Sequence, residues 1–162
     1  MEGSEMKILL AVDGSPCSEA AVEEICSRPW PAGSEVRVLV VDGPLEDPIR
    51  YSTSSTVFDE LVLQLRSAAN GHLNRAVEAI RLRAPQLTVS SCLREGRPKQ
   101  EILNEIEQWG ADLVVVGSNG YGAIGRILLG SVSLAVASHA PCNVLIVRSQ
   151  ACRAAAQPEA EA

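Results

Sequence analysis

A chain of 162 residues suits one domain, or one domain with a tail, and is long enough to bury a core. Its formal net charge of −6 argues against a nucleic-acid surface, which needs clustered Lys and Arg. No run of about 18 apolar residues occurs and the first residues are polar, so we expect a soluble protein without a membrane span or signal peptide. Five cysteines without CxxC spacing predict reduced thiols in the cytoplasm rather than disulfides or a zinc site.

The first third of the chain predicts a strand, a helix and a second strand. Residues 7–12 begin with Lys7 and then run apolar from Ile8 to Val12, which indicates a buried strand. Ser15 is a good N-cap and Pro16 suits the first position of a helix, which should stop before Pro29. Residues 35–41 alternate and then become apolar, so they predict the second strand of a right-handed βαβ unit.

The middle of the chain predicts a loop, a long helix, a strand and a further helix. Residues 42–56 are rich in Gly, Pro, Ser and Thr and indicate a long loop. From Val57 to about residue 83, apolar residues recur every three or four positions, which predicts one amphipathic helix with the stripe Phe58, Leu61, Leu65, Ala68, His72, Ala76 and Ile80. Residues 87–93 predict a third strand, and a helix should run from Pro98 to Gly110.

A glycine-rich segment follows the next apolar run. Residues 113–116 predict a fourth strand, and glycines at 117, 120, 122 and 125 follow it directly. Glycines let a ligand approach backbone N–H groups, and the N-terminus of the next helix, residues 131–139, favours phosphate. The alternative is a mobile surface turn, since glycine loops alone are weak evidence. Residues 143–147 predict a fifth strand after Pro141.

These elements predict a doubly wound, Rossmann-like α/β fold. Five parallel strands, in the order 3-2-1-4-5, should have helices on both faces. Ligands in such sheets bind beyond the carboxyl ends of the strands, so residues 11–15, 41–43 and 117–125 should converge there. We expect one domain over residues 1–149, and a disordered tail over residues 150–162, which are rich in Ala and Glu without apolar periodicity.

The spacing of the glycines resembles a known family. Gly117, Gly120, Gly130 and Ser131 fit the pattern G-x2-G-x9-G-[S/T] without gaps. Together with residues 11–15 on the first strand and 139–142 before the last, the pattern resembles the ATP-binding branch of the universal stress protein family. The resemblance covers about residues 6–147.

That resemblance implies a nucleotide site and its residues. Asp13 would hydrogen-bond the ribose, and the adenine would be lined by Ala11, Val12, Val40 and Val41, with Val40 offering its backbone. Val116 and Gly117 would flank the adenosine. The phosphates would be held by Asn119, Gly120, Gly130, Ser131, Val132 and Ser133.

The resemblance also implies partners. The ligand would be ATP, or ADP or AMP, with Mg²⁺ held through the phosphates rather than by protein side chains. Tyr121 stands where the family often has a basic residue, and Ala123 stands where it commonly has glycine. Arg126 is the only cation of the loop, so it would share the phosphate charge with backbone N–H groups and Mg²⁺. Family members commonly form homodimers through the last strand, here Asn143–Val147.

Three functions compete at this point. The first is a nucleotide-sensing regulatory protein of the stress response, with slow or no hydrolysis, because no base is evident near the loop. The second is an enzyme: a nucleotide-activating enzyme would carry an SGGxDS-like loop, and a Ser131–His139–Asp112 hydrolase a G-x-S-x-G elbow, and neither is present. The third is a dimeric scaffold without ligand.

Overall fold

The protein is described by a computed structural model over residues 5–43, 55–120 and 129–149. Its strands form one parallel sheet in the order β3-β2-β1-β4-β5, which confirms the predicted fold. The strands are β1 (Lys7–Ala11), β2 (Glu35–Asp42), β3 (Thr88–Glu95), β4 (Leu113–Gly117) and β5 (Asn143–Val147). The predicted tail, Tyr121, Ala123 and Arg126 lie outside the described residues.

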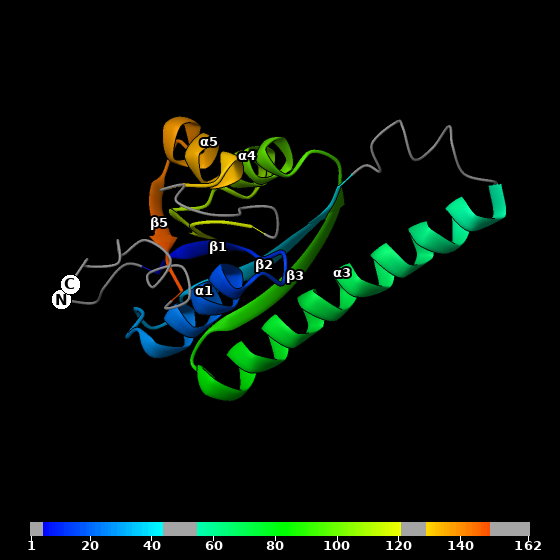
Figure 1. Cartoon of the computed structure of the whole chain (residues 1–162). Coiled ribbons are helices and arrows are strands. Elements are labelled where there is room, and N and C mark those ends of the chain that lie inside the picture. Colours follow the sequence, from blue (N-terminus) through cyan, green and yellow to red (C-terminus); the bar gives the residue numbers. More distant parts are fainter. Residues whose placement is uncertain (1–4, 44–54, 121–128, 150–162) are drawn as a thin grey trace, which may run out of the picture.

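Helices cover both faces of the sheet (Figure 1). Helices α1 (Pro16–Ser27) and α3 (Ser55–Arg83) lie on one face, and α4 (Pro98–Trp109) and α5 (Ser131–His139) on the other. Side chains alternate along each strand, so Ile8 and Leu10 enter the core under α1 and α3, whereas Leu9 enters the core under α4 and α5. Burial on both faces explains the continuous apolar runs. In the described part of the chain, no helix is both long and apolar enough to span a membrane.

The helix ends follow their capping residues. Ser15 accepts a hydrogen bond from the Ser18 N–H at 3.3 Å, and Pro16 opens α1 as predicted. Gly110 ends α4 in the left-handed conformation, with φ of 70°.

The predicted apolar stripe of α3 is wrong at Leu65 and Ala68. Leu65 is 39% exposed and Ala68 is exposed, whereas the buried face consists of Ala69, Leu73, Ala76, Val77 and Ile80. Figure 1 shows the reason, because the first half of α3 runs out beyond the sheet. Periodicity therefore identified the helix correctly but could not show how much of it meets a core.

Gly117, at the end of β4, touches the first turn of α1. A Cβ atom there would lie 2.7 Å from the carbonyl carbon of Cys17 and 2.8 Å from the backbone nitrogen of Ser18. Both are backbone atoms, which cannot move aside without shifting the helix. A glycine is therefore required at this position for α1 to begin directly against β4.

Helix α4 is fastened to the sheet by a buried carboxylate. The Glu105 side chain is 2% exposed. Its Oε1 accepts a hydrogen bond from Arg37 Nη1 of β2 at 2.8 Å, and its Oε2 accepts one from Arg94 Nη2 of β3 at 2.6 Å. The Arg37 guanidinium also lies 4.4 Å from the centre of the Trp109 ring, at the end of α4. We call Arg37, Arg94 and Glu105 the Glu105 clamp.

The charge of the clamp is maintained by its hydrogen bonds. Burial raises the pKa of the Glu105 carboxyl, but hydrogen bonds and attraction from Arg37 and Arg94 outweigh burial. The pKa therefore lies below its ordinary value, and Glu105 is ionised at neutral pH.

The clamp predicts a pH-dependent contribution to stability. Because the pKa of Glu105 is lower in the folded state, its carboxylate stabilises the fold above the unfolded value of about 4.3, and this contribution is lost as the pH falls through the folded-state pKa. Glu105→Gln should lower the free energy of unfolding by about 2 kcal/mol at neutral pH. In urea titrations, the difference in the free energy of unfolding between the parent and Glu105→Gln should become smaller below about pH 4. The exposed Glu107→Gln is the control, and a Glu105→Gln deficit independent of pH would contradict the assignment.

Two glycines should respond oppositely to the same substitution. Gly117→Ala should lower the free energy of unfolding by about 2 kcal/mol, because its methyl group would collide with the α1 backbone. Gly71→Ala, inside α3, meets only Arg75 Nη1 at 3.6 Å and should raise the free energy by about 0.5–1 kcal/mol. Chemical unfolding measures both, and a neutral Gly117→Ala would show that the contact is not restrictive.

Candidate functional site

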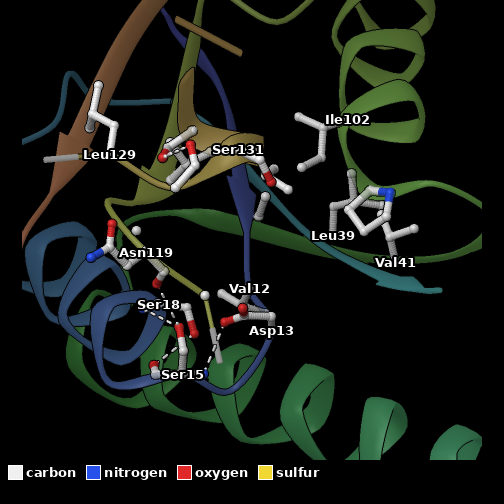
Figure 2. Close-up of a pocket in the computed structure, with 18 residues that line it drawn as sticks. Val12, Asp13, Ser15, Ser18, Leu39, Val41, Ile102, Asn119, Leu129 and Ser131 are labelled. Carbon is white, nitrogen blue, oxygen red and sulfur yellow. Dashed lines mark hydrogen bonds between the residues drawn. The ribbon is translucent and has the colours of Figure 1, made fainter. Parts of the chain in front are cut away.

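A cavity of about 450 Å³ lies at the carboxyl ends of the neighbouring strands β1 and β4, which lead to helices on opposite faces of the sheet (Figure 2). Its volume is within the usual range for small-molecule sites. It brings together the site residues predicted from the sequence, apart from Val40 and Arg126. The predicted residues that line the cavity are Ala11, Val12, Asp13, Val41, Val116, Gly117, Asn119, Gly120, Gly130, Ser131, Val132 and Ser133.

Val40 and Arg126 stand apart from this group. The Val40 side chain is 3% exposed and belongs to the core on the opposite face of the sheet, under α1 and α3. Its neighbours Leu39 and Val41 line the cavity instead, as the alternation of a strand requires. The role predicted for Val40 involves its backbone, so the position of its side chain does not test that prediction. Arg126 lies outside the described residues.

One end of the cavity is apolar. Leu39 and Val41 of β2 and Val116 of β4 form its floor, and Ile102 of α4 faces them (Figure 2). Pro98, at the first position of α4, completes this wall. Such a slot suits a flat, weakly polar group because apolar side chains contact it from both sides.

Asp13 supplies the carboxylate of the cavity. Its Oδ1 accepts the backbone N–H of Ser15 at 2.9 Å, which fixes the side chain in a tight turn. Its Oδ2 faces Gly120, where a Cβ atom would lie only 2.8 Å away. The absence of a side chain at Gly120 leaves this oxygen accessible, so it can accept hydrogen bonds from hydroxyl groups.

The start of α5 forms another wall. Ser131, Val132 and Ser133 occupy the first turn of this helix, where backbone N–H groups have no partner within the helix and carry partial positive charge. The Ser133 hydroxyl donates to the Ser118 carbonyl at 2.7 Å, and the Gly130 N–H donates to the same oxygen at 2.8 Å. The Ser133 proton is therefore used within the fold, and its backbone N–H is the better donor to an anion.

Asn119 carries an unsatisfied oxygen beside the cavity. Its Oδ1 is buried, and within the described residues it is the one buried side-chain polar atom without a hydrogen-bond partner. Its backbone carbonyl is already used, since it accepts the Ser15 hydroxyl at 3.3 Å. A buried acceptor without a donor is costly, so this atom suits a bound ligand or water.

Sequence reasoning missed some residues of the lining: Ser18, Leu39, Pro98, Ile102 and Leu129. Leu39 could have been found, because it lies two positions before Val41 and so on the same face of its strand. Pro98 and Ile102 gave no such signal. They reach the cavity only because α4 crosses the end of β2, which is a tertiary arrangement.

The geometry rules out the Ser131–His139–Asp112 triad. Ser131 and His139 stand at opposite ends of α5, about 12 Å apart along the helix axis. His139 Nδ1 lies 2.9 Å from the Ala135 carbonyl, so its ring is engaged at the end of its own helix. Asp112 accepts the Lys7 backbone N–H at 2.8 Å. It precedes β4 and so lies at the amino ends of the strands, on the side of the sheet away from the cavity.

The cysteines of the described segments are free thiols. Burial raises the pKa of Cys142, and likewise the pKa values of Cys26 and Cys92. A raised pKa leaves less of the reactive thiolate at neutral pH, so these side chains serve packing.

Known proteins share this sequence and fold. A protein of Thermus aquaticus described as a universal stress protein is 36% identical over 145 residues, covering 87% of this chain and 97% of its own. The solved structure of the hypothetical protein MJ0577 has a TM-score of 0.76 and 27% identity, and covers 90% of this chain and 96% of its own. A universal stress protein family protein of Arabidopsis thaliana, solved with AMP bound, has a TM-score of 0.68 and 19% identity, over 96% of this chain and 97% of its own.

The family model agrees with these relatives. The model described as the universal stress protein family matches residues 6–148, nearly the whole described part of the chain. With the fold, the cavity and the sequence relatives in agreement, the chain belongs to the universal stress protein family.

Proposed function

We propose that this protein binds an adenine nucleotide, ATP or its products ADP and AMP, and acts as a nucleotide-sensing module of the stress response. The observation that carries the proposal is the cavity itself. It joins an apolar slot, an accessible carboxylate and the N-terminus of a helix, in the places where a nucleotide presents its base, its sugar and its phosphates.

Each part of a nucleotide has a matching part of the cavity. The base suits the slot between Ile102 and the floor formed by Leu39 and Val41. The ribose hydroxyls suit Asp13, whose free oxygen accepts hydrogen bonds. The phosphates suit the first turn of α5 with its unpaired N–H groups, and Mg²⁺ would bind through the phosphates and water.

A bound relative supports the ligand class. The Arabidopsis thaliana protein was solved with AMP, on the same fold. Asn119 adds support from this chain, because the residue lines the cavity and its buried Oδ1 has no hydrogen-bond donor among the described residues.

The lining favours binding over rapid hydrolysis. Among its described residues, Asp13 is the one titratable side chain, and it is held by the turn to Ser15. A general base must reach the attacking water, and no histidine or second carboxylate of the described lining does so. We therefore propose slow or no turnover, and a regulatory role read from the bound nucleotide.

The proposal includes a cytoplasmic location. Its support is that the described cysteines, Cys17, Cys26, Cys92 and Cys142, are not joined in disulfides, as is usual in a reducing compartment.

Calorimetry with ATP and Mg²⁺ tests the proposed site. The intact protein should bind, and Asp13→Asn should weaken binding about tenfold to a hundredfold, because its amide nitrogen cannot accept the ribose hydroxyls. Asparagine keeps one oxygen for the Ser15 N–H, so the turn should survive.

Asp59→Asn is the matched control, because Asp59 is exposed on α3 and does not line the cavity. It should bind ATP like the parent. No binding of ATP, ADP or AMP by the intact protein would reject the nucleotide proposal in favour of a ligand-free scaffold.

We further propose a homodimer through β5. This strand is an edge of the sheet, and its register with β4 directs the backbone groups of Asn143, Leu145 and Val147 toward β4. The N–H and C=O groups of Val144 and Ile146 therefore point to the outer side. An unpaired row of this kind is a template for pairing with a second copy.

Sedimentation of two variants tests this dimer. Ile146→Pro removes an outward N–H without removing a bond to β4, so the variant should dissociate at least tenfold more readily. Ile146→Ala loses the same apolar side chain but keeps the N–H, and it should remain dimeric. Equal association of the two variants would show that the β5 backbone does not form the interface.

A further inference from the structure

Helix α4 has two parts with different surroundings. Its first turn supplies Pro98 and Ile102 to the wall of the cavity. Glu105, one turn later on the same face of the helix, enters the Glu105 clamp. The helix thus connects a salt-bridge network directly to the apolar end of the cavity.

Strands β2 and β3 also connect the Glu105 clamp to the apolar end of the cavity. Arg37, Leu39 and Val41 alternate along β2 and share one face, so the arginine of the clamp continues the row that forms the cavity floor. On the neighbouring strand Arg94 pairs with Val41 in register. The clamp therefore adjoins the apolar end of the cavity on both strands.

The clamp fixes the position of α4 over the sheet and also contributes to the stability of the fold. Glu105 reaches both arginines only when α4 lies over β2 and β3 together, since Oε1 meets Arg37 at 2.8 Å and Oε2 meets Arg94 at 2.6 Å. Without the carboxylate, two positive groups face the helix with no counter-charge, and the contact becomes unfavourable. The apolar contacts of Ile102 and Ile106 remain, but the hydrophobic effect is non-directional and does not by itself select one position of the helix over β2 and β3.

We propose that Glu105 is a positioning residue of the ligand cavity. By holding Arg37 and Arg94 it fixes α4 over β2, and so sets the spacing between Ile102 and the floor of the slot. This inference rests on the proposed function, because it takes the apolar end to be the place of the base. Glu105 acts without touching the ligand.

Hydrogen exchange tests the positioning directly and needs no nucleotide. In Glu105→Gln, exchange of the backbone amides of residues 100–104 should accelerate by a factor at least tenfold larger than the factor for the amides of α5. Glu107→Gln is the matched control, being the same change on the exposed side of the same helix. Unchanged rates in α4, or an equal increase in all helices, would overturn the proposal.

Calorimetry then asks whether the cavity depends on this positioning. At a temperature where all variants are fully folded, Glu105→Gln should bind ATP about tenfold more weakly than the parent and Glu107→Gln equally well. Loosened α4 with unchanged ATP affinity would overturn the positioning role. If the parent itself binds no nucleotide, the proposed function fails, and the exchange rates alone decide whether Glu105 fixes α4.

Discussion

The contact between Gly117 and the first turn of α1 is the constraint on which the site depends. Because no side chain separates them, the loop after β1 and the loop after β4 meet at one point. Ser15 can then donate to the Asn119 carbonyl, and the Ser118 hydroxyl reaches Cys17 Sγ at 3.5 Å. A residue with a side chain at this position would separate the Asp13 side of the cavity from the side formed by the start of α5.

Helices α4 and α5, on the cavity face of the sheet, contribute different groups to the cavity. Helix α5 offers backbone N–H groups at its start, and that start is held by the Gly130 and Ser133 bonds to Ser118. Helix α4 offers only apolar side chains there, and its polar anchorage lies one turn further along. Charged groups of the clamp thus stay outside the slot, which keeps the apolar end free of competing polar partners.

The sequence predicted the elements well because each was encoded locally. The apolar runs, Ser15 before Pro16, and Gly110 after α4 depend on neighbours in the chain, and the strands and caps lie where these signals put them. The loops that build the cavity were also foreseeable, since parallel strands end at one edge. Ile102 and the Glu105 clamp were not, because they depend on how α4 crosses the sheet. The exposed first half of α3 was missed for the same reason.

That exposed half of α3 has a consequence for how the molecule opens. Residues 57–65 include Val57 at 53% and Leu63 at 68% exposure, so little burial stabilises this stretch. A helix without tertiary contacts is only marginally stable in water. Farther along, Leu73, Val77 and Ile80 are buried in the core. One continuous helix therefore contains two units of different free energy, and its outer turns can unwind and re-form while the sheet and its cavity stay closed.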